Sequence, residues 1–142
     1  MRISRFNALD GADKRLLMRA AGWLAVARVM MFAMSFSRLA ARLTVSEDSA
    51  GQEADPEVLS KVSWAVAAAE NNVPWRSDCF PQTIAASKLL RKVGHGSTIH
   101  LGVERVGDDE LAGHAWLTCG DELVTGHGVD LSRYTELHSF RA

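Results

Sequence analysis

The chain has 142 residues, of which 47% are hydrophobic and 23% are charged, with a formal net charge of −1 and two cysteines. These values are typical of a soluble globular protein, and they exclude a disordered or fibrous chain, a disulfide-stapled scaffold and a strongly basic nucleic-acid-binding protein. We therefore expect a single domain over residues 1–142, reduced and cytoplasmic, with no nucleic acid among its partners.

An apolar helical segment is predicted at the N-terminus, over residues 13–43, with Asp10 or Asp13 as its cap. The serines of SFSR compete for backbone hydrogen bonds, so a break is expected there. Residues 20–36 read AAGWLAVARVMMFAMSF, and Arg28 is the only charge among them. This run is short for a membrane span and has a costly central arginine. We expect a helix that is buried, or that contacts a partner or a membrane surface.

Two further helices are predicted after a polar linker. Residues 44–57 are acidic and contain a glycine and a proline, which indicates a surface linker. A second helix is expected to begin at Pro56 and to end before NNVPWRS. A third helix is expected to begin at Cys79, with Asp78 as N-cap and Gly94 just past its C-terminus.

A small antiparallel sheet is predicted after these helices. Beyond Gly96 the apolar period changes from 3.6 to 2, and STIHLGVERV reads as a strand. GHAWLTCGDELVTG then reads as a hairpin that turns at Gly120 and Asp121. Because helices precede strands, the predicted fold class is α+β.

The first candidate for chemistry is the cysteine at the start of the third helix. Cys79 is expected at the first helical position, and Pro81 is tolerated in the same turn. Unpaired backbone N–H groups and the positive end of the helix dipole favour a thiolate there and leave a donor for an oxyanion. The Asp78 carboxylate opposes this effect unless capping engages it. Cys79 is therefore a candidate nucleophile.

His114 is the expected base for this nucleophile. It begins the strand HAWLTC, where a period of two places His114 and Trp116 on one face and Cys119 on the other. A cysteine at a helix N-terminus and a histidine on a downstream strand is the arrangement of papain-like and transglutaminase-like enzymes. The alternative is a core cysteine and a strand histidine that bonds to the backbone, and the spacing alone does not separate the two.

The remaining histidines and the second cysteine are interpreted as structural. His95 follows the end of a helix, where it would complement the dipole. His100 is expected to face solvent from its strand, and Cys119 is expected to pack in the core. These residues have no zinc-ligand spacing, and the chain has no glycine-rich phosphate loop, so neither a metal nor a cofactor is expected.

Two stretches, CFPQTIAASKLLRKVGHGSTIHLGV and AGHAWLTCGDELVTG, together resemble the B2 proteins of lasso-peptide biosynthesis. That family consists of transglutaminase-like cysteine peptidases. The resemblance covers about residues 58–140, including the closing DLSRYTELHSF. It implies a transglutaminase-like or papain-like peptidase core over residues 58–142.

The resemblance implies that the chain is a leader peptidase. Cys79 would attack the carbonyl at the leader–core junction of a ribosomally made precursor peptide, with His114 as general base and acid. It also implies three partners: the precursor peptide, a small leader-recognising B1 protein and the ATP-dependent lasso cyclase. Acyl transfer to an amine and a non-catalytic, precursor-binding scaffold stay open as alternatives.

One position departs from the family pattern. Many members carry an aspartate twelve residues after the histidine, where this chain has Gly126. Asp121 is expected at the hairpin tip, about 20 Å from His114, and is no substitute. The site is then either a Cys-His dyad or a triad that Asp130 completes by folding back after the hairpin. Of the two, we favour Asp130.

Overall fold

The computed structural model describes residues 3–44, 55–74 and 78–142, so most of the predicted linker (45–54) lies outside the described residues. The helices in these ranges are α1 (Ile3–Ala8), α2 (Gly11–Ala33), α3 (Phe36–Leu43), α4 (Pro56–Glu70) and α5 (Cys79–Lys92). The strands are β1 (Thr98–Arg105), β2 (Leu111–Cys119), β3 (Glu122–Thr125) and β4 (Thr135–Arg141), with the short 3-10 helix η2 (Leu131–Arg133) before β4. The predicted α+β class is confirmed.

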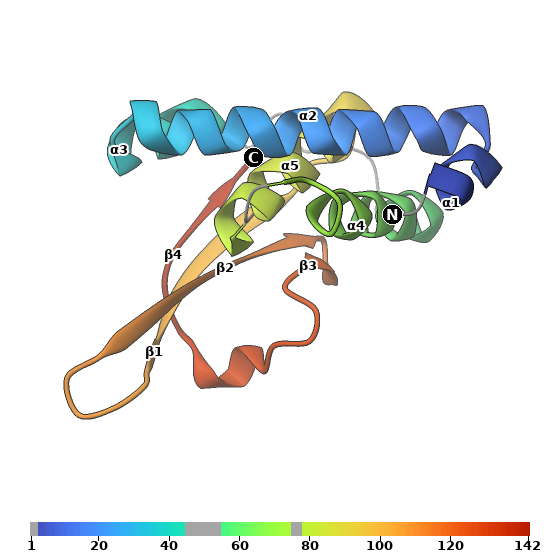
Figure 1. Ribbon diagram of the computed structural model, residues 1–142. Coiled ribbons are helices and arrows are strands. Elements are labelled where there is room, and N and C mark those ends of the chain that lie inside the picture. Colours follow the sequence, from blue (N-terminus) through green and yellow to red (C-terminus); the bar gives the residue numbers. More distant parts are fainter. Residues whose placement is uncertain (1–2, 45–54, 75–77) are drawn as a thin grey trace.

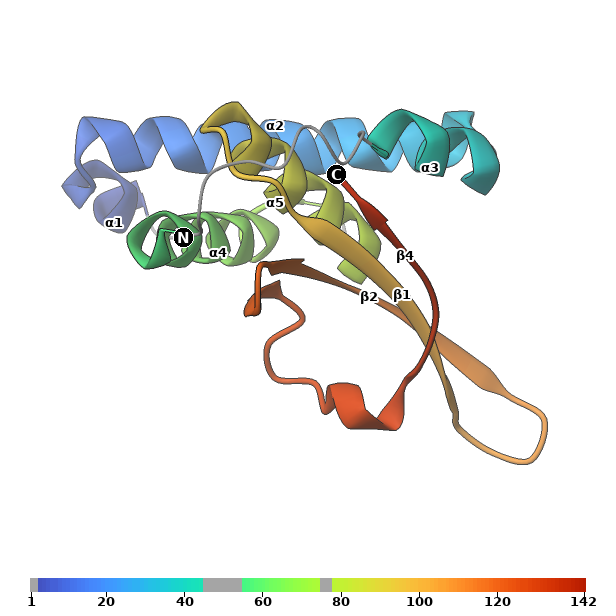
Figure 2. The same ribbon diagram turned by 180° about the vertical axis from the view of Figure 1, so that it is seen from behind.

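The elements stack in three layers. α2 forms the outer layer, α4 and α5 form the middle layer, and the sheet lies on the far side of these two helices in both views (Figures 1 and 2). α2 contacts α4 and α5, and α5 also contacts β1, β2 and β3. Because α5 is covered on two sides, its buried residues are small or aliphatic along much of its length: Pro81, Thr83, Ile84, Ala85, Ala86, Ser87, Leu89 and Leu90.

The predicted N-terminal segment divides into two helices at SFSR, as expected: α2 ends at Ala33 and α3 begins at Phe36. Asp10 caps α2, accepting a hydrogen bond from the Asp13 N–H at 2.7 Å. One face of α2 packs into the domain and buries Leu17, Ala20, Leu24 and Ala27. By length and composition α2 could cross a membrane. The short α1 that precedes it was not predicted.

The predicted ends of α5 are confirmed. Cys79 is its first residue and Asp78 occupies the N-cap position, but the Asp78 side chain makes no capping hydrogen bond, so the predicted cap is wrong in that respect. At the C-terminus, Gly94 adopts a φ of +83°, and the N–H groups of Gly94 and His95 bond back to the last turn. This is the glycine-terminated helix end that the sequence predicts.

The sheet is antiparallel with strand order β3-β2-β1-β4. The β2–β3 hairpin turns at Gly120 and Asp121, as predicted, with a φ of +58° at Gly120. β4 was not predicted; it returns along the free edge of β1, with a bulge between Leu101 and Gly102. This return brings the segment after the hairpin back beside β2, where the candidate site lies.

Candidate active site

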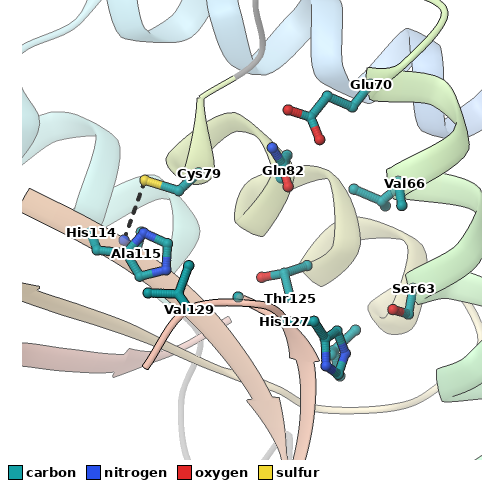
Figure 3. Close-up of a pocket in the computed structure, with 13 residues that line it drawn as sticks. Ser63, Val66, Glu70, Cys79, Gln82, His114, Ala115, Thr125, His127 and Val129 are labelled. Atoms are coloured by element: carbon teal, nitrogen blue, oxygen red, sulfur yellow. Dashed lines mark hydrogen bonds between the residues drawn. The ribbon is translucent and has the colours of Figure 1, made fainter. Parts of the chain in front are cut away.

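A pocket of about 310 Å³ contains both members of the predicted catalytic pair. Cys79 enters it from α5, and His114 enters it from β2 (Figure 3). Glu70 of α4, Gln82 of α5 and Gly126 at the end of β3 also line it. Residues far apart in the sequence therefore meet around one cavity.

Hydrogen bonds on both sides fix the position of Cys79. The Thr83 hydroxyl donates to the Cys79 carbonyl at 2.8 Å and lies 3.2 Å from the Thr125 hydroxyl, so the first turn of α5 is tied to β3. The Ala115 N–H donates to Cys79 Sγ at 3.4 Å (Figure 3). Because Ala115 follows His114, this bond holds the sulfur next to the backbone of the histidine. A donor aimed at sulfur also supports the thiolate that attacks a carbonyl.

His114 lies among aromatic rings. Its ring centroid is 6.1 Å from that of Trp116 and 5.1 Å from that of Tyr134. Burial lowers the pKa of His114 below its usual value of 6.5. The imidazole is therefore mainly neutral at pH 7, the form that can accept the proton of a thiol.

One nitrogen of His114 faces the glycine that departs from the family pattern. Nε2 is buried and has no hydrogen-bond partner among the described residues. A Cβ added at Gly126 would lie 3.6 Å from this nitrogen. An aspartate at position 126 would therefore face His114 Nε2, the atom that its carboxylate would bond. Since Nε2 faces Gly126, Nδ1 is the nitrogen left to serve Cys79.

Asp130 does not occupy that place. Its Oδ1 accepts hydrogen bonds from the Ser132 N–H at 3.1 Å and from the Ser132 hydroxyl at 2.5 Å, which caps η2. The Ser132 hydroxyl, followed by the Ser132 N–H, lowers the pKa of Asp130. The structure brings Cys79 and His114 together and leaves Asp130 exposed, away from His114 Nε2.

Tyr134, which the sequence did not point to, packs on His114. The phenol lies near the Glu104 carboxylate, which pairs with Arg133. Burial, followed by the Glu104 carboxylate, raises the pKa of Tyr134, so the phenol stays neutral. The rings of Tyr134 and Trp116 both pack against the His114 imidazole, and they restrict its rotation without a carboxylate.

His100 extends the same aromatic stack. Its ring lies 5.4 Å from that of Trp116 and nearly parallel to it. Its Nδ1 bonds to Glu136 at 2.6 Å, and its Nε2 bonds to the Thr118 hydroxyl at 2.8 Å. The prediction that His100 faces solvent is wrong, because β4 brings Glu136 to its side of the sheet.

Cys119 packs in the core, as predicted, whereas the His95 side chain bonds to the start of α4 and not to the end of its own helix. His95 is buried, and its Nε2 accepts a hydrogen bond from the Asp55 N–H at 3.4 Å, at the start of α4. Cys119 is buried in the core, and burial raises the pKa of its thiol. Within residues 3–44, 55–74 and 78–142, no three His, Cys, Asp or Glu side chains are arranged to hold a metal ion.

Gly126 has a conformation that a side chain would strain. Its φ is +99°, and an added Cβ would lie 2.8 Å from the Trp116 Cβ. We expect Gly126→Ala to lower the free energy of unfolding by about 2–4 kcal/mol, through the left-handed backbone and the clash. Urea denaturation measures this change.

Gly128→Ala is the matched control for this prediction. Gly128 has a φ of +81°, but no atom of the described residues lies within 4 Å of an added Cβ. We expect a loss of about 1–2 kcal/mol from the backbone alone. Equal losses in the two variants would mean that Trp116 moves aside freely, and that an aspartate at position 126 would meet no steric obstacle.

Comparison with known proteins gives one family. The chain matches the Transglutaminase-like superfamily over residues 21–139, a range that runs from α2 to β4 and includes Cys79 and His114. No curated protein and no solved structure matches the chain. Members of this superfamily are typically enzymes with a catalytic cysteine. The chain folds as a transglutaminase-like domain and belongs to the transglutaminase-like superfamily.

Proposed function

We propose that this chain is a cysteine peptidase that removes the leader from a ribosomally made lasso-peptide precursor. The observation that carries the chemistry is the bond from Ala115 N–H to Cys79 Sγ, which holds the sulfur beside His114 in an open pocket. The choice of substrate rests on the resemblance of the CFPQ and HAWLTC stretches to lasso-peptide B2 proteins. The proposed partners are the precursor, a B1 protein that recognises the leader, and the lasso cyclase.

The proposed reaction has two halves, both served by the same two side chains. His114 takes the Cys79 proton, and the thiolate attacks the carbonyl carbon at the leader–core junction. The Cys79 N–H, at the first position of α5, would donate to the oxyanion. His114 then gives its proton to the leaving amine, which departs with the core and leaves the leader as a thioester. Water attacks the thioester carbonyl as His114 takes a proton from it. The C–S bond then breaks, Cys79 regains its proton from His114, and the leader leaves as a carboxylic acid.

We infer that the site works as a dyad. The rings of Trp116 and Tyr134 would orient His114 by packing, in place of the carboxylate that Gly126 lacks. A cysteine nucleophile tolerates the loss of the orienting carboxylate, because its thiol is intrinsically very nucleophilic and depends less on that acid than a hydroxyl does.

Acyl transfer is the second candidate, and the superfamily match supports it as well. The two functions share the thioester and differ only in whether water or an amine opens it. The side chains around Cys79 serve either acceptor.

The products of the reaction separate hydrolysis from transfer. We expect the chain, incubated with the precursor and the B1 protein encoded beside its gene, to release the leader as a free acid. Mass spectrometry in the presence of added methylamine gives the measurement, because hydrolysis and transfer yield leaders of different mass. A methylamide in place of the acid would contradict the peptidase. A gene neighbourhood that holds neither a precursor nor a cyclase would contradict the lasso-peptide substrate.

A further inference from the structure

The outward face of α2 is an exposed apolar stripe. Its side chains recur at helical spacing, and their exposed fractions are high: Met18 63%, Val26 44%, Val29 65% and Phe32 83%. The opposite face of α2 is buried against α4 and α5. Both views show α2 along one edge of the domain, with α4 and the sheet on one side of it (Figures 1 and 2). Because α2 is apolar on both faces, its exposed face indicates contact with a second apolar surface in addition to the domain core.

Basic side chains flank this stripe on both sides. At 100° per residue, Arg19 falls on one flank and Arg28 on the other, and Arg15 falls within the stripe, about one turn before Met18. The Arg28 guanidinium lies 5.7 Å from the centroid of the Phe32 ring. Asp13, the one acidic residue in the α2 sequence, is engaged with Lys61 of α4 at 3.0 Å. The rim of the stripe on α2 is therefore positive.

The charge of the whole chain is divided in the same sense. Residues 1–43 contain eight Lys and Arg against two Asp and Glu, a net charge of +6. Residues 44–142 contain eight against fifteen, a net charge of −7. The overall charge of −1 thus conceals a basic helical layer on an acidic body. An anionic surface would attract the basic residues 1–43 and repel the acidic residues 44–142. It would therefore orient the molecule with α2 toward the surface.

We propose that α2 docks the domain on the surface of an anionic lipid bilayer. The stripe, formed by Met18, Val26, Val29 and Phe32, enters the headgroup region, and the flanking arginines meet lipid phosphates. α2 lies in the plane of the surface, because crossing the bilayer would strip its buried face from α4 and α5. A second copy of the chain fits this face less well, since a dimer through α2 would bring together two copies of residues 1–43, each with a net charge of +6.

Sedimentation with lipid vesicles tests this docking. We expect the full chain to bind vesicles of equal parts phosphatidylcholine and phosphatidylglycerol, and not vesicles of phosphatidylcholine alone. Val29→Glu is expected to weaken binding about tenfold or more, because it puts a charge at the centre of the stripe. Arg19→Gln is expected to weaken it about fivefold, the contribution of one basic residue near an anionic surface.

Two variants with matched changes elsewhere serve as controls. Leu111 is 63% exposed, close to the 65% of Val29, and lies at the start of β2. Leu111→Glu is expected to bind vesicles as the wild type does. Arg91→Gln removes one positive charge from the last turn of α5, outside residues 1–43, and is also expected to bind normally.

Each contrary result overturns the proposal. Equal binding to neutral and anionic vesicles would show that the positive charge plays no part. A loss of vesicle binding in Leu111→Glu as large as that in Val29→Glu would show that the stripe plays no specific part. Retention on vesicles through an alkaline carbonate wash would indicate a spanning helix. Absence of vesicle binding, with a dimer that Val29→Glu dissociates, would make a second copy the cover. Precursor cleavage without vesicles is expected to be unchanged in Val29→Glu, so failed docking leaves the proposed peptidase untouched.

Discussion

Cys79→Ala is expected to abolish leader release. Loss of the nucleophile in a triad-type site costs on the order of 10⁶ in kcat, so kcat/KM for the precursor should fall by about 10⁴-fold or more. The fold should tolerate the change, because Cys79 is partly exposed and its sulfur contributes one long hydrogen bond, from the Ala115 N–H. The measurement is the rate of leader release, with urea denaturation of the same samples.

Cys119 is the matched control for this variant, because it is the other cysteine in the chain. It is 2% exposed and its thiol donates to the Gly96 carbonyl, away from the pocket. Cys119→Ala is expected to lower stability by about 1–2 kcal/mol, as the loss of a small buried group does, and to keep the wild-type kcat. Wild-type cleavage by Cys79→Ala would reject the nucleophile assignment and favour the scaffold alternative.

The sequence predicts the site well where the signals are local. Asp78 and Cys79 mark the start of α5 and Gly94 follows its end, and their capping and turn preferences depend on neighbours within a few residues. The same holds for the hairpin, because Gly120 supplies the positive φ of its turn. Period-2 alternation then places His114 and Trp116 on one face of β2. The meeting of the helix start with this strand, however, is read from the family resemblance and not from any local signal.

The sequence fails where a side chain takes its place from distant pairing. β4 is exposed along most of its length, so no apolar alternation marks it as a strand. Its pairing with β1 brings Glu136 to His100 and, at its start, Tyr134 to His114. Both contacts depend on the register of two strands more than thirty residues apart, which no short-range pattern specifies.

The third catalytic residue shows how local bonds compete with distant ones. Asp130 follows the hairpin closely enough to reach back, and its carboxylate is ionised at neutral pH. Ser132, two residues on, satisfies that carboxylate with two hydrogen bonds at no cost in loop closure. The structure therefore favours the dyad, with His114 Nε2 left facing Gly126.

His114→Asn is expected to lower kcat/KM for the precursor by about 10²–10⁴-fold, the range for loss of a general acid and base. The wild-type rate should also fall in acid, because a protonated imidazole cannot accept the Cys79 proton. Burial lowers the pKa of His114, so the midpoint of this acid limb should lie below 6.5. The same shift means that the unfolded chain binds the proton more tightly, so stability also falls as the pH drops from 6.5 through the lowered pKa.

His127 is the matched control for His114, because both histidines line the pocket and only His114 neighbours the residue that bonds Cys79 Sγ. His127→Asn is expected to keep both the wild-type rate and the acid limb, whereas His114→Asn should lose the limb along with the rate. Disappearance of the limb in His114→Asn alone would assign the acid limb to His114. An acid limb that persists in His114→Asn and vanishes in His127→Asn would transfer the role of base from His114 to His127.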